Sequence, residues 1–344
     1  MRKYGVMLIG CGHIGAEHLD DIYHRPEFSV EAVVDRDPQR AQRFAQRYGA
    51  RSWGEDYMPF LFDKAIQIVI IATYADSHLS ILEDCVAAGK HVLCEKPVAI
   101  TLEDGDRFCH LVKNAKTKVL VAHVLRHNAS YKAIADMIHA GEIGNLRLMR
   151  MVQNHHAMNW PRYKKLLENC PPIVDCGVHY LDVMQWFSGS KICKVSGIST
   201  KLDPDSPRDN YGMIHAVMEN GCIGYYESGW GKSISAQNIK EFVGDKGRIT
   251  LTLQYNRMSD QEEGDLITLY RGDTGEYRTI NLQSKYKDMY GQMRALVDMI
   301  ENDTPAQPSM EDVFSAFVAA KTAEKAIAQG LVLDIPNDTE ETER

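Results

Sequence analysis

A glycine-rich turn between an apolar run and an amphipathic stretch constrains this chain more than any other feature. The segment VMLIGCGHIGAEH carries Gly10, Gly12 and Gly15 in the order G-x-G-x-x-G. Small residues in such a strand-turn-helix segment let the backbone turn tightly and approach a pyrophosphate, whose charge is met by the helix N-terminus. The glycines alone are a weak signal, because a glycine-rich turn can also serve the fold without binding a ligand.

An acidic residue at the end of the next apolar run strengthens the nucleotide interpretation. Asp35 lies twenty residues after Gly15, where a carboxylate can accept a hydrogen bond from a ribose 2′-hydroxyl. That carboxylate would repel the 2′-phosphate of NADP, so the sequence favours NAD as the cofactor. NADP stays possible, because the guanidinium of Arg36 could pair with a phosphate. His13 and Ile14 fill variable positions of the turn and are expected beside the cofactor without a catalytic role.

Short apolar runs alternate with longer amphipathic segments from residue 4 to about residue 124. The runs are VMLIG, VEAVVD, IQIVIIAT, HVLCEK and VLVAHV, and helical stretches follow Gly15, Pro38, Asp76 and Thr101. Runs without polar alternation indicate strands that are covered on both faces. The repetition predicts an α/β domain over 1–124 with a doubly wound parallel sheet, the Rossmann fold.

The second half, 125–344, follows a different rhythm. The segments GMIHAVMENGCIGYYESGW and EFVGDKGRITLTL each place a turn signal between apolar runs, which predicts antiparallel hairpins. Two helices follow, one around YGQMRALVDMIEN and one from about Ser309 to Gly330. The sequence therefore predicts a second, α+β domain with a large, mostly antiparallel sheet and a polar tail at about 337–344.

Composition narrows the classes of protein that this chain can belong to. Its 344 residues favour two domains. The 39 basic and 47 acidic residues leave a formal net charge of −8, which offers no field to attract nucleic acid or an anionic membrane. Its apolar runs fall short of the roughly 20 residues of a membrane span, and the first is too short for a signal peptide. Eight cysteines without a C-x-x-C motif predict reduced thiols in a cytoplasmic protein.

An ordered set of motifs resembles the Gfo/Idh/MocA oxidoreductases, a family that includes inositol dehydrogenases and glucose-fructose oxidoreductase. The motifs are GCGHIG, VIIATYADSH, CEKP, AHVLRHN, GEIGNL, IVDCGVHYLD and FVGDKG. The resemblance spans almost the whole chain and implies a Rossmann domain followed by a domain with an open, largely antiparallel sheet. Because members often use that sheet for contacts between subunits, a homodimer or homotetramer is expected.

The resemblance also implies cofactor contacts beyond the glycine-rich turn. Thr73 and His78 would lie near the cofactor, although Tyr74 stands where the family usually has proline. Glu95 would lie beside the nicotinamide ribose, and Lys96 after it is also expected to contact the cofactor. Arg126 and, across a loosely matched gap, Arg162 are further candidates. Arg126, with His123 near it, is equally well interpreted as a hydrogen-bonding residue between the domains.

Three residues are the candidates for catalysis. Lys96 belongs to the EKP segment, which in the family lies at the end of the fifth Rossmann strand. PPIVDCGVHYLDVMQWF predicts one helix with Asp175, His179 and Asp182 along one face. That face could be a solvated stripe, but the resemblance implies that Asp175 and His179 are a catalytic pair and leaves Asp182 structural. Imidazole suits proton transfer near neutral pH, so we assign the substrate proton to His179. Lys96 would stabilise negative charge on the reacting oxygen, and whether it takes the proton itself is left open.

The substrate is expected to meet Lys96, Asp175 and His179, with His155 and Trp160 as further candidates. The loop before the predicted helix has the sequence CPP where many members have three glycines, which leaves its path open. A metal site is not expected, because the neighbouring His155 and His156 should point apart in a strand and the chemistry needs no metal.

The function that these residues predict is hydride transfer between a nicotinamide cofactor and a secondary hydroxyl of a sugar, inositol or polyol, or the matching ketone. One alternative is an NAD-binding sensor without catalysis, which would not need Lys96, Asp175 and His179 together. The other is an NAD-dependent glycoside hydrolase that oxidises its sugar only transiently. That hydrolase would keep its cofactor bound and show no net reduction of it.

Overall fold

The computed structural model describes residues 3–253 and 264–336, and the chain divides into two compact units. The first unit comprises 1–127 and 287–314, and the second comprises 128–286 and 315–344. The helix α10 (Met289–Asn302) therefore belongs to the first unit, whereas the sequence analysis assigned it to the second domain. The physical reason is packing, because Met293, Leu296 and Val297 of α10 lie in the hydrophobic core of the first unit.

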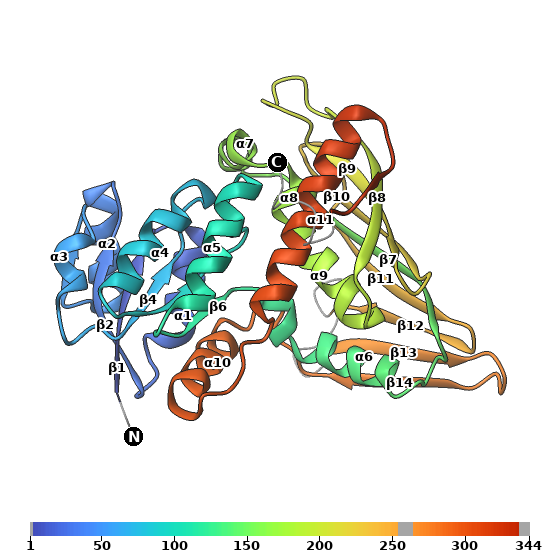
Figure 1. Ribbon diagram of the computed structural model, residues 1–344, viewed down its shortest axis with the longest axis horizontal. Coiled ribbons are helices and arrows are strands. Elements are labelled where there is room, and N and C mark those ends of the chain that lie inside the picture. Colours follow the sequence, from blue (N-terminus) through green and yellow to red (C-terminus); the bar gives the residue numbers. More distant parts are fainter. Residues whose placement is uncertain (1–2, 254–263, 337–344) are drawn as a thin grey trace. The chain divides into compact units, whose positions relative to one another are not determined.

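The first unit is built on a six-stranded parallel sheet, which confirms the predicted Rossmann domain (Figure 1). Its strand order is β3-β2-β1-β4-β5-β6, so the chain moves outward from β1 in both directions. In such sheets, ligands bind at the carboxyl ends of the strands where the order switches. The strands are β1 (Tyr4–Ile9), β2 (Phe28–Val34), β3 (Ser52–Gly54), β4 (Ile68–Ile71), β5 (His91–Cys94) and β6 (Val119–Val121).

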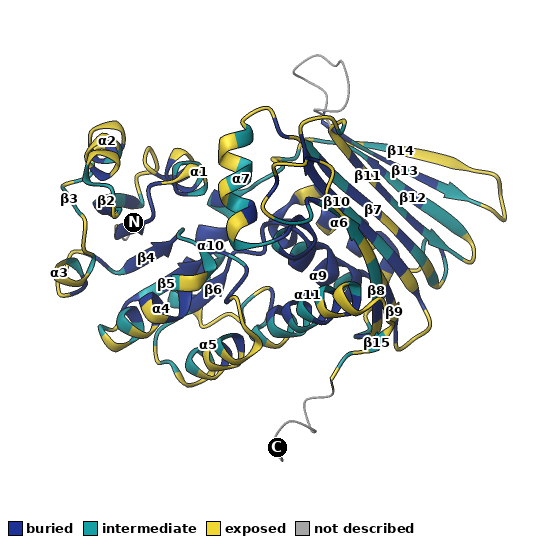
Figure 2. Cartoon of the chain, turned by 90° about the horizontal axis from the view of Figure 1, so that it is seen from above, coloured by how far each residue is buried: buried dark blue, intermediate teal, exposed yellow. Residues whose placement is uncertain are grey.

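Helices flank this sheet, and Figure 2 shows its strands largely buried and the outer sides of α2, α4 and α5 exposed. Asp37 caps α2 by accepting the backbone N–H groups of Gln39 and Arg40, and Thr101 caps α5 by accepting that of Asp104. Besides α10, the helices are α1 (His13–Ile22), α2 (Pro38–Tyr48), α3 (Met58–Leu61), α4 (His78–Ala87) and α5 (Leu102–Asn114), with 3-10 turns η1 (Ala75–Ser77) and η2 (Val124–His127).

The second unit is built on a nine-stranded sheet in the order β14-β13-β12-β11-β7-β10-β9-β8-β15. All neighbouring strands are antiparallel except β10 and β7, which confirms the prediction of a mostly antiparallel sheet. The strands are β7 (Leu146–His156), β8 (Ile192–Thr200), β9 (Tyr211–Met218), β10 (Ile223–Gly231), β11 (Gln237–Gly244), β12 (Gly247–Thr252), β13 (Asp265–Arg271), β14 (Tyr277–Leu282) and β15 (Leu333–Asp334).

Helices α6, α9 and α11 lie on one face of this sheet (Figure 1). The side chains on that face form a core that includes Met149, Met151, Leu181, Tyr226 and Phe242, each at most 1% exposed. The helices are α6 (Ala129–His139), α7 (Trp160–Asn169), α8 (Pro172–Asp175), α9 (Gly177–Ser188) and α11 (Met310–Gln329), of which α11 begins in the first unit. The predicted polar tail at 337–344 lies outside the described residues.

Candidate active site

The glycine-rich turn after β1 has the geometry of a phosphate cradle. Gly10 has a φ of +100°, and a Cβ atom there would lie 2.5 Å from the carbonyl oxygen of Ala72. A Cβ atom on Gly15 would lie 2.2 Å from the carbonyl oxygen of Gly10. A Cβ atom on Gly12 would meet nothing within 4 Å, which leaves open space at the N-terminus of α1. These residues therefore fit a dinucleotide pyrophosphate, which would be stabilised by the backbone N–H groups of that helix.

Asp35 is held rigidly beside this turn, at the end of β2. One carboxylate oxygen accepts the backbone N–H of Cys11 and the other accepts that of Asp37, both at 2.9 Å. A carboxylate has about four acceptor positions, so it can still accept a ribose hydroxyl. The nearby cation is Arg40 of α2, 3.5 Å from Asp35, whereas Arg36 is exposed. Arg40 was not predicted as the cation beside Asp35. Its position one helical turn after Arg36 along the chain could have suggested it.

The other predicted residues of the turn lie at the surface of α1. His13 is exposed and its Nε2 lies 2.8 Å from Glu17, one helical turn along. Ile14 is half-buried.

The segment after β4 is tied to the EKP segment by His78. Its side chain is fully buried, with Nδ1 2.9 Å from the carbonyl oxygen of Pro97 and Nε2 3.2 Å from that of Thr73. Burial lowers the pKa of His78 below its usual value, so the neutral ring has one N–H to donate. His78 was expected to lie near the cofactor. In the structure both of its ring nitrogens contact backbone carbonyl oxygens, so the side chain positions the EKP segment. Tyr74 has a φ of −81°, close to the angle of proline.

Glu95 forms a buried pair that the sequence analysis did not predict. Its Oε1 lies 2.8 Å from Nε2 of His18 on α1, with His18 1% and Glu95 8% exposed. Burial alone would raise the pKa of Glu95, but the hydrogen bond and charge of His18, with the charges of Lys96 and Lys287, lower it below its usual value. His18 shares the buried face of α1 with Gly15, Leu19 and Ile22, which was the available sequence signal.

Lys96 and Arg126 differ in how the first unit holds them. Lys96 is half-buried directly after β5, and its backbone N–H lies 3.3 Å from Oε2 of Glu95. The peptide bond between Lys96 and Pro97 is cis. Arg126 is 7% exposed and lies 3.5 Å from Asp312. Asp312 belongs to the same unit, so this ion pair tests neither the cofactor contact nor the interdomain role, and both stay predictions for Arg126.

Asp175 and His179 lie in the second unit on two short helices instead of the single predicted helix. α8 ends at Asp175 and α9 begins at Gly177, while Cys176 between them keeps helical dihedral angles of −84° and −30°. Asp175 and His179 are half-buried, as a reacting pair should be, and Asp182 is 1% exposed. The burial of Asp182 fits the structural role expected for it.

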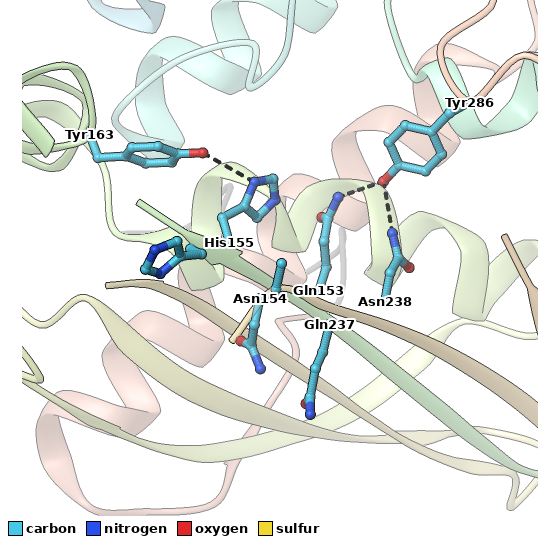
Figure 3. Close-up of a pocket in the computed structure, with 9 residues that line it drawn as sticks. Gln153, Asn154, His155, Tyr163, Gln237, Asn238 and Tyr286 are labelled. Atoms are coloured by element: carbon cyan, nitrogen blue, oxygen red, sulfur yellow. Dashed lines mark hydrogen bonds between the residues drawn. The ribbon is translucent and has the colours of Figure 1, made fainter. Parts of the chain in front are cut away.

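A cavity of about 260 Å³ lies at the end of β7 in the second unit. The hydroxyl of Tyr286 accepts N–H groups from Gln153 (2.5 Å) and Asn238 (3.5 Å), and Tyr163 lies 3.3 Å from Nδ1 of His155 (Figure 3). The side chains that line the cavity are amides, imidazoles, phenols and one methyl group. They are Gln153, Asn154, His155, His156, Tyr163, Ala236, Gln237, Asn238 and Tyr286.

Of the second-unit candidates for ligand binding, only His155 lines this cavity in the described part of the chain. Trp160 donates to Asp205 at 2.8 Å, and Arg162 is exposed with its guanidinium 5.8 Å from the ring of Tyr163. Trp160, Arg162, Asp175 and His179 therefore gain no support from the cavity, and their roles toward a ligand stay predictions. Gln153 and Asn238 were not predicted to line the ligand cavity. Gln153 could have been, because it lies two residues before His155 in one strand and therefore on the same face.

Within residues 3–253 and 264–336, no three His, Cys, Asp or Glu side chains gather as metal ligands would. Within the same ranges, no helix has the length and apolar character needed to cross a membrane.

Comparison with known proteins assigns both units to one family. Residues 4–123 match the oxidoreductase family with an NAD-binding Rossmann fold, and residues 131–250 match the GFO/IDH/MocA C-terminal domain. Myo-inositol 2-dehydrogenase of Thermotoga maritima is 21% identical, over 94% of this chain and 96% of the relative. Inositol 2-dehydrogenase of Corynebacterium glutamicum is 24% identical, over 96% of each chain.

A solved structure shares the fold over nearly the full length. Scyllo-inositol dehydrogenase of Lactobacillus casei, solved with NAD(H) and scyllo-inositol, is 20% identical, covers 97% of this chain and 99% of its own, and superimposes with a TM-score of 0.80. The two matched domains, in this order along the chain, confirm the resemblance inferred from the motifs. The chain belongs to the Gfo/Idh/MocA family of oxidoreductases with an NAD-binding Rossmann domain.

Proposed function

We propose that this protein is an NAD-dependent dehydrogenase that oxidises a secondary hydroxyl of an uncharged polyol, an inositol foremost, or reduces the matching ketone. The observation that carries the substrate class is the cavity of the second unit, which is lined by amides, imidazoles and phenols. Such groups both donate and accept hydrogen bonds, as the hydroxyls of a polyol do. The inositol dehydrogenases among the relatives support the same class.

The residues of this chain supply binding and proton transfer. The glycine-rich turn and Asp35 hold the cofactor, which when bound accepts the hydride from the carbinol carbon. His179 takes the hydroxyl proton, and Asp175 orients or charge-balances the site. Lys96 donates to the reacting oxygen and stabilises the negative charge that develops on it.

The direct test is a screen of inositols, linear polyols and sugars with NAD and with NADP, followed by nicotinamide absorbance. We expect reduction of NAD with at least one inositol or polyol. Tight binding of NAD without turnover of any compound would favour the sensor alternative. Cleavage of a glycoside without net reduction would favour the hydrolase.

Asp35 gives a prediction about cofactor choice. Changing Asp35 to Ser is expected to lower kcat/KM for NAD by about 10- to 100-fold, because a hydrogen bond to a charged acceptor is lost. The same change removes a negative charge beside Arg36 and Arg40, so activity with NADP should rise relative to NAD. Kinetics with both cofactors check this. An unchanged ratio of NAD to NADP activity in the folded variant would contradict the role of Asp35.

We further propose that the protein is a homodimer or homotetramer formed through the second-unit sheet. Ile198, Ile223 and Ile239 lie in its strands β8, β10 and β11 and are 60%, 49% and 51% exposed. Val217, 37% exposed, pairs with Ile223 across β9 and β10. Light scattering should give a dimer or tetramer, and Ile223→Glu should shift it toward the monomer by burying a charge. A monomeric wild-type protein would contradict this assembly.

A further inference from the structure

A buried lysine lies two residues along β11 from the cavity side chain Asn238, on the same face of the strand. Lys240 of β11 is 1% exposed, and its Nζ donates to the carbonyl oxygens of Val152 (2.8 Å) and Ile239 (3.2 Å) and to Oδ1 of Asn238. Nζ also lies 4.6 Å from the centre of the Tyr180 ring. Burial lowers the pKa of Lys240 well below its usual value. Burying an amino group is costly, so a strand that needed only a packed core would carry an apolar residue here.

The contact with Lys240 fixes the orientation of the Asn238 amide. Because Lys240 donates to Oδ1, the Nδ2 group of Asn238 is the end that faces Tyr286, 3.5 Å from its hydroxyl oxygen. An amide nitrogen can only donate, so the hydroxyl oxygen of Tyr286 accepts from Asn238 and from Gln153. Gln153 is paired with Asn238 across β7 and β11. Figure 3 shows the amide nitrogens of Gln153 and Asn238 both directed at the Tyr286 hydroxyl, and Lys240 holds the Asn238 end of this network.

The same lysine contacts the helix that carries His179. Tyr180, over whose ring the amino group lies, follows His179 directly in α9. The ring of Tyr180 stacks on Tyr226 of β10, with the ring centroids 4.4 Å apart. Tyr180 is also a neighbour of Tyr286. Lys240 therefore touches β7, β11 and α9 at one point.

We propose that Lys240 is a positioning residue for the polyol cavity, which fixes the Asn238 amide and sets α9 against β7 and β11. This inference rests on the proposed function, because it assumes that the cavity holds the polyol. Lys240 itself does not touch the substrate in this account. It determines which hydrogen-bonding groups the cavity presents and where.

The test compares two buried lysines. Lys90 is 7% exposed, lies in the first unit and donates to the carbonyl oxygens of Asp63 (2.8 Å) and Ile66 (2.7 Å). Lys240→Met is expected to raise KM for the polyol about 10- to 100-fold, because the Asn238 amide loses the partner that orients it. KM for NAD should stay unchanged. Lys90→Met should lower the melting temperature and leave KM for the polyol unchanged.

A second variant tests the orientation without removing the lysine. Asn238→Asp keeps an oxygen toward Lys240 but replaces the N–H donor that faces Tyr286, so KM for the polyol should again rise about 10-fold or more. Because Asn238→Asp is nearly isosteric, it still tests the inference if the Lys240→Met variant does not fold. If either folded variant keeps KM for the polyol within about twofold of the wild type, the inference is overturned. Failure of the proposed function is a different result, since the wild type would then turn over no polyol.

Discussion

Replacing Lys96 with methionine is expected to lower kcat with the polyol by about 100- to 10,000-fold. Methionine keeps the length of the side chain but cannot donate a hydrogen bond or balance negative charge on the reacting oxygen. The affinity for NAD should change little, because the glycine-rich turn and Asp35 are untouched. Steady-state kinetics and NAD titration measure both effects. The exposed Lys64, changed to Met in the same unit, is the control and should keep full activity.

His179→Ala separates the proton duty from charge stabilisation. If His179 takes the proton, this variant should lose the acidic limb of the pH profile of kcat/KM, because the group that must be deprotonated to act as the base is gone. Lys96→Met should keep that limb at a reduced rate. A dead Lys96→Met enzyme beside a nearly normal His179→Ala enzyme would assign the proton to Lys96 instead.

The His18→Leu variant is expected to lose about 3–5 kcal/mol of unfolding free energy at neutral pH, because it leaves the buried carboxylate of Glu95 without its hydrogen-bond partner. Denaturant unfolding measures the loss. On the same helix, the exposed His13, paired with the half-buried Glu17, supplies the control, since His13→Leu should cost less than about 0.5 kcal/mol. His18→Gln keeps an N–H donor and should recover much of the stability.

The pH dependence of that difference follows from the lowered pKa of Glu95. A carboxyl group whose pKa is lower in the folded state stabilises the fold above its unfolded pKa of about 4.3. This stability is lost as the pH falls through the lower, folded value. The gap between wild type and His18→Leu should therefore narrow below about pH 4. A gap that is constant from pH 7 to pH 3 would show that the cost comes from packing alone.

The cofactor half of the fold was predictable because its signals are local. Gly10, Gly12, Gly15 and Asp35 lie within one strand-helix-strand unit, so their spacing determines their geometry. The apolar runs likewise predicted the strands of the parallel sheet except β3, whose three residues Ser52–Gly54 include no apolar run. His18 shows the limit of such local signals, since its partner Glu95 comes from a strand far along the chain.

The second unit was harder, because its pattern of burial departs from the usual alternation. In β11, Asn238 and Lys240 face the core with Phe242, while Ile239 is 51% exposed. Hydrophobic patterning would place Ile239 in the core and Lys240 in solvent, so it would assign the wrong face of β11 to the core. The assignment of α10 to the second domain was wrong for a related reason. An amphipathic sequence specifies a helix but not the sheet against which that helix packs.

The central claim is hydride transfer from a polyol carbon to NAD, and isotope transfer tests it most directly. The protein is incubated with NAD and with inositols and polyols that carry deuterium on their carbinol carbons, and the nicotinamide is analysed by mass spectrometry. Our account predicts NADH that carries deuterium, together with an equal amount of the ketone. Substrate that is bound or cleaved while no deuterium accumulates in NADH would contradict it.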